Sequence, residues 1–467
     1  MSDIDGATTA DPDEQTALLF NNSKPKVRTP LPKLQLTILL ILNLCEPITG
    51  LSIYPYINQL IGELDITGGD KRKVGYYAGL IESLFFVTQA FTVLHWSRAS
   101  DHIGRKPVLL IGLAGSAISM LFFGLSRSFW LLVISRCLCG LLNGNVGVMK
   151  SVMGEITDST NRADGFAMIP VIYALGVTVA PMIGGSLSRP HERFPETFTS
   201  RFWRDYPYFL PCVVSASVSF FGFIITLILL KETVPRRSHD ENGMSPPDSK
   251  PVPLRQLLTY PVLISIANYV SLAFLEINIY ALIPLFMAMP TSIGGMELSP
   301  AMIGYLFGAF GAFNGIYQTL CFARIARRFG ERRVMITAMS MFPIIFLLLL
   351  TMSIMLKNRG PQWIVWTLLT CMFLLMAMMD MGFGCVFIYI TTSSPNKRSL
   401  GATNGLTQTT VSIVRAIGPA MTTSLFSFSV TNNLLGGYGV YVILSILSCA
   451  MLPIVTCLPP KPWEEKD

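Results

Sequence analysis

The feature that most constrains this chain is a series of apolar stretches, each about as long as a membrane is thick. A helix needs about 20 predominantly apolar residues to cross a bilayer. Hydrophobic residues make up 51% of the sequence and charged residues only 13%, whereas soluble domains carry about 25% charged residues. The sequence therefore predicts an all-α protein that crosses the membrane many times.

The apolar stretches divide into two groups of six. They cover residues 34–60, 74–96, 107–126, 129–152, 165–187, 208–230, 260–289, 301–323, 334–356, 363–390, 402–429 and 438–458. They predict twelve transmembrane helices in two six-helix bundles, 34–230 and 260–458, with tails at 1–33 and 459–467. The intervening segment 231–259 is rich in Pro, Ser and charge, which is typical of a flexible linker.

Lys and Arg indicate the orientation in the membrane, because cytosolic loops carry an excess of both residues. Cytosolic termini place the basic runs Arg98–Lys106 and Arg324–Arg333 inside, although Lys71–Lys73 falls outside against the trend. Residues 1–33 contain no apolar core, so we expect no cleavable signal peptide. Glu14–Leu19 resembles an acidic dileucine sorting signal. The destination stays open between the plasma membrane and the vacuolar membrane.

Two charged segments hold the same place in the two bundles. Ser97–Pro107 follows the second apolar stretch of the first bundle, and Ala323–Arg333 follows the second stretch of the other. We interpret both as cytosolic loops of a duplicated unit. Such repeats are typical of secondary transporters, in which the substrate binds near the bilayer midplane between the repeats. A channel is disfavoured because no Gly-rich filter segment is visible.

The first charged segment resembles motif A of the major facilitator superfamily, G-x-x-x-D-(R/K)-x-G-(R/K)-(R/K). Four positions match: Asp101, Gly104, Arg105 and Lys106. Ser97 and His102 depart from the motif. The resemblance implies a cytosolic gate at these four residues, in which Asp101 locks the two halves in one state. The second segment has Arg327 at the corresponding position, so we expect the gate to be asymmetric.

Two further motifs lie inside apolar stretches. Arg136 begins Arg136–Gly140, which resembles motif B, where this arginine is implicated in proton coupling; a structural salt bridge is the alternative. Gly176–Gly185 resembles motif C of the antiporter branches, with Ala180 in place of one Gly. Its matching positions are Gly176, Pro181, Gly184 and Gly185. Small residues at this spacing let helices approach closely, and ordinary packing is the alternative role.

The second half carries an echo of motif C at Arg415, Gly418 and Pro419. Together with Glu46-Pro47, this pattern resembles the tetracycline-efflux and zinc-induced-facilitator-like branch in its fungal form, over residues 34–458. The N-terminal Cys motif of plant zinc facilitators is absent, which disfavours a zinc-related substrate. The resemblance implies a monomeric drug:proton antiporter that exports a drug or secondary metabolite and uses the proton gradient instead of a cofactor. The modest net charge of +7 does not suggest nucleic-acid binding.

Proton coupling requires a carboxylate inside the membrane that can bind a proton or the substrate, and such charges are costly there. Glu46 is our first candidate, coupled to Arg136, because the first and fourth helices line the cavity in the resembled fold. Glu276 is the second candidate. Glu82, which like Arg136 is expected nearer the outer face, and Asp380, in the middle of the tenth helix, are weaker candidates, with a structural role as the alternative.

Eight uncharged polar or aromatic residues are candidates for lining the cavity, with simple packing as the alternative. They are Tyr54, Tyr173, Asn278, Tyr280, Asn314, Tyr317, Gln318 and Tyr389. The alternative functions are a facilitator or proton symporter for a nutrient or metal chelate, and a non-transporting receptor with the same fold. An enzyme or ATP-driven pump is not expected, because the sequence contains no Walker A loop, nucleophile elbow or metal-ligand spacing.

Overall fold

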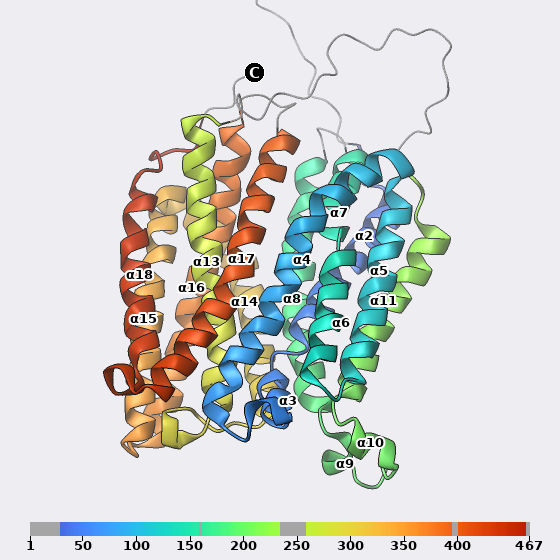
Figure 1. Ribbon diagram of the computed structural model, residues 1–467. Helices are drawn as coiled ribbons and strands as arrows, with labels where there is room; N and C mark the ends of the chain where they lie inside the picture. Colours follow the sequence, from blue (N-terminus) through green and yellow to red (C-terminus); the bar gives the residue numbers. More distant parts are fainter. Residues whose placement is uncertain (1–28, 158–160, 234–257, 395–399, 464–467) are drawn as a thin grey trace, which may run out of the picture.

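The computed structural model describes residues 29–157, 161–233, 258–394 and 400–463. Within these ranges, a few helical side chains lie outside the description: Leu94, Asp101, Arg162–Asp164, Phe166, Ala167, Pro170 and Leu400–Ala402. Figure 1 shows long helices standing side by side in two groups, with α2–α11 in one group and α13–α18 in the other.

The described residues contain twelve membrane-spanning helices, six in each half. In the first half they are α2 (Lys33–Leu51), α4 (Val74–Ile103), α5 (Arg105–Gly124), α6 (Phe129–Leu142) with its continuation α7 (Asn145–Ile156), α8 (Arg162–Leu187) and α11 (Phe209–Leu229). In the second half they are α13 (Tyr260–Ala288), α14 (Pro300–Phe329), α15 (Glu331–Lys357), α16 (Gln362–Ser393), α17 (Leu400–Thr431) and α18 (Gly439–Thr456). The predicted fold class is confirmed.

Shorter helices connect the spans at one end of the molecule. They are α3 (Ile57–Gly62), α9 (Pro190–Arg193), α10 (Arg201–Asp205) and the 3-10 turns η1 (Asp65–Thr67), η2 (Lys71–Lys73), η3 (Thr291–Ile293) and η5 (Leu434–Gly437). In Figure 1, α3, α9 and α10 lie at the bottom of the view, at the end of the molecule opposite α7. We refer to the end with α3 as the outer end, and to the other as the cytosolic end.

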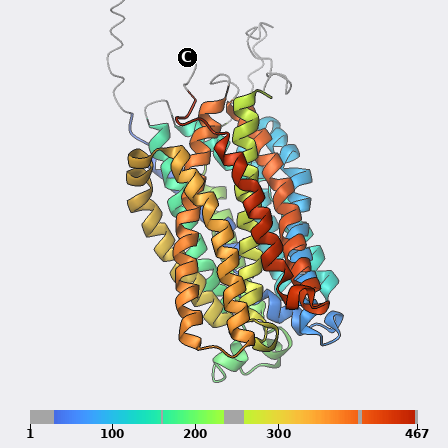
Figure 2. The same ribbon diagram turned by 90° about the vertical axis from the view of Figure 1, so that its left-hand side faces the viewer.

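Composition alone identifies nine of the described helices as long and apolar enough to cross a membrane. The described apolar part of α8, Val171–Leu187, is too short for that criterion. The helices α4 and α14 do not meet it either, since they carry polar side chains such as Glu82 and Asn314 and have basic residues near their cytosolic ends. Both helices face the opposite half, where α4 packs against α17 and α14 packs against α8. Figure 2 shows the far side of the second half, where α15 packs against both α16 and α18.

Two predicted spans are interrupted. The stretch 34–60 is not one helix: α2 ends at Leu51, and Pro55, which has no N–H to donate, lies in the turn before α3. The stretch 129–152 breaks at Asn143 and Gly144, between α6 and α7, where a Cβ at Gly144 would overlap with the side chain of Trp96. The Trp96 indole nitrogen donates to the Leu141 carbonyl over 2.7 Å, which occupies the freed backbone at this break.

The two charged segments are not loops, which corrects the sequence interpretation. α4 continues to Ile103 and α5 begins at Arg105, so Gly104 alone separates them; Gly330 alone separates α14 from α15 in the same way. Gly104 has φ 103° and Gly330 has φ 81°, a backbone region that favours glycine. The duplication therefore extends to the geometry of the turn.

The halves meet closely in the outer part of the molecule. Gly185 of α8 packs against Pro300 and Gly304 of α14, with a Cβ at Gly185 only 3.0 Å from the Gly304 Cα. In the other seam, a Cβ at Gly79 of α4 would lie 2.7 Å from the Pro419 carbonyl oxygen of α17. Glycines thus allow backbone-to-backbone contact along both seams.

Candidate functional site

A cluster of charged side chains lies midway along the helices, between the two halves. In the second half, Arg415 of α17 forms an ion pair with Glu276 of α13, with 3.2 Å between Arg415 Nη2 and Glu276 Oε2. Both side chains are mostly buried. This pair gives two intramembrane charges a fixed partner, which reduces the cost of burying them.

Asp380 of α16 has a neutral partner. The Asn314 side-chain amide of α14 donates to Asp380 Oδ2 over 2.6 Å, and Gln318 of the same helix donates to the Ala377 carbonyl over 2.8 Å. The other Asp380 oxygen is buried and accepts no hydrogen bond among the described residues. Asn314, a predicted lining residue, therefore holds the Asp380 carboxylate, and Gln318, another, binds the backbone of the same helix α16.

The first half contributes Glu46 of α2, Lys150 of α7 and Tyr173 of α8. Asn143, at the break between α6 and α7, lies next to the Glu46 carboxyl group, and the charges of Arg415 and Lys150 also act on this group. The Tyr173 side chain is half exposed, at 49%. It lies within electrostatic range of Glu46, Glu276, Asp380 and Arg415, so the cluster draws charges from both halves.

Arg136 of α6 lies apart from this cluster. It is 3% exposed and lies over the rings of Phe85 and Phe123, at 5.0 Å and 6.0 Å. Its nearby acid is Glu82 of α4, which accepts a hydrogen bond from Tyr54. The structure therefore brings Arg136 toward Glu82, whereas Glu46 is grouped with Arg415 and Lys150.

The remaining predicted lining residues occupy different positions. Tyr280 stacks with Phe307 and lines a cavity together with Tyr54 and Glu82. Tyr317 stacks with Phe313 on α14.

Two of these residues are fully buried. Asn278 packs under Gly418, where a Cβ would lie 2.8 Å from the Asn278 side-chain oxygen. The Tyr389 hydroxyl donates to the Pro459 carbonyl over 2.8 Å, near the end of the described chain. Tyr389 therefore lies outside the central cluster, contrary to its predicted lining position.

Sequence reasoning missed Lys150 and Asn143. Lys150 is two residues from the end of the predicted span 129–152, and a lysine at the end of a span is expected to lie at the membrane surface. The structure extends the span to Ile156, which moves Lys150 into the membrane. The signal for its depth was the apolar run Val152-Met153 that follows it.

Motif C positions α8 against two neighbours. A Cβ at Gly176 would overlap with Pro47 of α2, and one at Gly184 would overlap with the Ser52 carbonyl oxygen. A Cβ at Gly185 would meet the Pro300 carbonyl of the other half. In the second-half echo, the Ala420 N–H next to Pro419 donates to Ser83 of α4 over 2.9 Å, across the halves.

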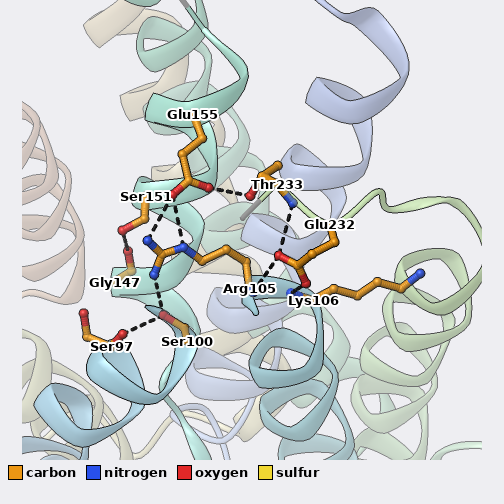
Figure 3. Close-up of polar contacts among 9 residues, drawn as sticks. All are labelled: Ser97, Ser100, Arg105, Lys106, Gly147, Ser151, Glu155, Glu232 and Thr233. Carbon is orange, nitrogen blue, oxygen red and sulfur yellow. Dashed lines mark hydrogen bonds and ion pairs between the residues drawn. The ribbon is translucent and has the colours of Figure 1, made fainter. Parts of the chain in front are cut away.

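At the cytosolic end, a carboxylate caps the first turn of α5 (Figure 3). The backbone N–H groups of Arg105 and Lys106 donate to the two oxygens of Glu232, over 2.8 Å and 3.1 Å. A negative charge at a helix N-terminus is favourable. A Cβ at Gly104 would lie 2.5 Å from the same carboxylate, so glycine is required here for space as well as for its φ.

The Arg105 side chain extends this network across helices (Figure 3). Its Nη2 lies 3.0 Å from Glu155 Oε1 on α7, and its Nη1 donates to Ser100 of α4. Glu155 also accepts from Thr233, just after α11. These contacts join α4, α5, α7 and α11, all of the first half.

The predicted gate residue Asp101 is in the last turn of α4, and its side chain lies outside the described residues. In the second half, the corresponding arginines bind backbone oxygens. Arg327 donates to Ala323 of its own helix, and Arg332 donates to Thr456 of α18 over 2.6 Å. The two turns share their backbone geometry but not their side-chain contacts.

The sequence profile of the Major Facilitator Superfamily matches residues 39–419. The chain belongs to the major facilitator superfamily. It is therefore an integral, multi-pass membrane transporter and not an enzyme. The superfamily assignment made from motif A is confirmed.

The chain is similar to transporters of fungi and other organisms. It is 30% identical to the major facilitator-type transporter psiT2 of Psilocybe cyanescens, covering 94% of this chain and 95% of that protein. It is 28% identical to the efflux pump azaK of Aspergillus niger, covering 91% and 88%. A tetracycline resistance protein of Vibrio anguillarum and a zinc-induced facilitator of Arabidopsis thaliana are also relatives, as the branch assignment predicts.

A solved structure supports the fold. The human organic anion transporter MFSD10 (TETRAN) superposes with a TM-score of 0.63 at 19% identity, covering 91% of this chain and all of that one. At 19% identity, this similarity supports the arrangement of the helices.

Proposed function

We propose that this transporter exports a small organic compound in exchange for protons, by alternating access of a central site. The observation that carries the proposal is the midplane cluster of Glu46, Lys150, Glu276, Asp380 and Arg415. Five ionisable groups at the interface of two membrane-embedded halves are expensive to retain unless they bind an ion or a charged substrate.

Glu46 is the residue best suited to proton exchange. Its uncharged polar neighbour is the Asn143 amide, and the charges of Lys150 and Arg415 act on it from two helices. Neither Glu46 nor Lys150 is in an ion pair among the described residues. A carboxylate held in this way can be neutralised by a proton or by a cationic substrate group, which is the competition that antiport requires.

Motif C supports antiport. The glycines of α8 bring its backbone against α2 and α14, which closes one seam between the halves on the outer side. A tight seam opposes passive leak when the central site is open to the cytosol. The direction of transport is supported by the relatives named as an efflux pump and a tetracycline resistance protein.

In this proposal the bundles 34–230 and 260–458 move against each other as units. The segment 231–259 tethers them on the cytosolic side. The energy source is the proton gradient, with no cofactor, and one chain forms the complete pathway. The substrate is a drug or secondary metabolite, and the membrane is the plasma membrane or the vacuolar membrane.

Inverted membrane vesicles that contain the full-length protein test the proposal. A pH gradient is imposed, and organic amines, drugs and fungal metabolites are added while internal pH is recorded. We expect at least one compound to accumulate and to dissipate the gradient. Transport that proceeds without any proton movement would contradict antiport and favour the alternative, a facilitator for a nutrient or a metal chelate.

A further inference from the structure

The outer half of the molecule contains a second titratable group, formed by Glu82, Tyr54 and Arg136. We propose that Glu82 is a second proton-binding residue, separate from the central cluster and located on its outer side. The inference rests on the proposed proton-coupled function and extends it to Glu82, a residue of α4 that belongs to none of the sequence motifs.

The partners of Glu82 are suited to a change of charge. The Tyr54 hydroxyl donates to one oxygen of its carboxylate, and Arg136 acts on it from a distance without a direct hydrogen bond. The Nε and Nη1 atoms of Arg136 are buried and have no hydrogen-bond partner in the described part of the chain. A purely structural pair would place the guanidinium on the carboxylate, because an unpaired buried charge is costly.

A cavity opens beside Glu82 across the interface of the halves. Its lining from the first half includes Tyr54, Asn58, Ala78 and Glu82, and its lining from the second half is Tyr280, Ala281, Pro284 and Thr423. Any rotation of one half against the other must change this cavity. The hydration of Glu82 is thereby linked to the conformational state of the transporter.

The groups around Glu82 come from several elements. Arg136 on α6 carries the nearby positive charge, while Tyr280 on α13 is the ionisable residue on the opposite wall. Thr423 of α17 and Asn58 of α3 also line the cavity and do not titrate. Phe85 and Phe123 cover the guanidinium face of Arg136.

Tyrosines connect this group with the centre. Tyr54 lies within electrostatic range of Tyr173, which in turn is within range of Glu46 and Glu276. In the proposed step, the Glu82 carboxylate takes one proton from a hydronium ion on the outer side when the seam opens, which leaves a water molecule and a neutral carboxylic acid. It returns that proton to water when the state reverses, so no covalent chemistry or co-reactant is needed.

Infrared difference spectroscopy during a pH titration tests the inference without a transported substrate. The purified full-length protein is held in lipid nanodiscs, and the carbonyl stretch of protonated carboxylic acids is recorded. We expect Glu82→Gln to remove one band that wild type gains on acidification, and Glu46→Gln to leave that band in place. Tyr54→Phe should shift the same band, because the hydroxyl no longer donates to it.

The matched control is Glu63→Gln, which removes a carboxylate outside the spanning helices that pairs with Arg189 at 3.4 Å. It should leave the band unchanged. A Glu82→Gln spectrum that keeps every wild-type band would overturn the inference, and so would a band insensitive to Tyr54→Phe in a folded variant. If wild type shows the band yet moves no protons with substrate, the proposed function fails and Glu82 remains a proton-binding residue.

Discussion

The two halves of the transporter share their helix order and their cytosolic turns, yet they hold their charges differently. In the second half, Arg415 is paired with Glu276, and Asp380 is bound by Asn314. In the first half, Glu46 lies next to the Asn143 amide, and neither Glu46 nor Lys150 is in an ion pair among the described residues. The difference suggests that the second half supplies a fixed polar wall and the first half supplies the groups that exchange partners.

At the cytosolic turns the contrast is reversed. The first-half turn is held by charged side chains, with Glu232 on the N-terminus of α5 and Arg105 on Glu155. The second-half turn is held by arginine contacts to backbone oxygens. The two halves therefore share the backbone of the turn but differ in its side-chain contacts. Charged side chains hold the turn in the first half, and arginine contacts to backbone oxygens hold it in the second.

The largest expected effect separates motif C from its echo. A Cβ at Gly184 meets the Ser52 backbone, which cannot move aside, whereas a Cβ at Gly418 meets side-chain atoms of Ile277 and Asn278 at 2.5 Å and 2.8 Å. Gly184→Ala should cost more than about 3 kcal/mol and Gly418→Ala about 1–3 kcal/mol. Melting temperatures in detergent measure both; equal losses would show that the echo is packed as tightly as motif C.

The next comparison is between two midplane cations: Arg415, which is paired with Glu276, and Lys150, which is in no ion pair among the described residues. Arg415→Gln leaves the Glu276 carboxylate without its partner and should destabilise the protein by about 1–3 kcal/mol. Lys150→Gln removes no ion pair and should change stability by less than about 0.5 kcal/mol. Thermal unfolding of the two purified variants makes the comparison. A Lys150 variant that unfolds as early as the Arg415 variant would contradict the distinction between the halves.

A smaller effect is expected at the cytosolic turns. Glu232→Gln weakens the charged cap on α5 and should cost about 1 kcal/mol. Arg332→Gln in the second half should cost less than about 0.5 kcal/mol, because one contact to a backbone oxygen is lost at an exposed site. The measurement is the difference in melting temperature between these two variants. Repeating it at higher salt concentration should reduce the difference, because salt screens the charge of the Glu232 cap.

The asymmetry extends to transport. Asp101→Asn should slow transport far more than Arg327→Gln, because the Arg327 side chain donates to the carbonyl of Ala323 in its own helix. Transport rates of both variants at matched abundance provide the measurement. Equal losses would refute a gate that depends on the first turn alone.

The sequence predicted the fold well, because twelve apolar stretches and a repeated motif leave few alternatives. The break at Gly144 was not predicted, since its surroundings include Trp96 of the neighbouring helix α4. The break before α3 was missed although Pro55 is a local signal for it. The interpretation of Ser97–Pro107 as a loop was wrong because charge is a weak guide to helix ends at a membrane surface, where polar residues extend helices into water.

The candidate site was predicted only in part. Glu46, Glu276 and Arg415 could be named because charges in apolar stretches are rare. Their partners could not, because pairing depends on the rotation of each helix about its axis, which apolar spans do not specify. Arg136 and Glu46 are both deep in the membrane, yet the structure places Arg136 beside Glu82 on the outer side. Lys150 was missed because the predicted span ends at residue 152, which puts this lysine at the membrane surface. The structure extends the helix to Ile156, so Lys150 lies deeper.

The central claim is that Glu46, the loosely held carboxylate of the first half, couples protons to export. Glu46→Gln and Glu276→Gln are reconstituted at equal abundance, and pH-driven transport of a compound carried by wild type is compared with its exchange at equal pH. The account predicts that Glu46→Gln abolishes pH-driven accumulation while exchange persists. Preserved pH-driven accumulation in Glu46→Gln would contradict it.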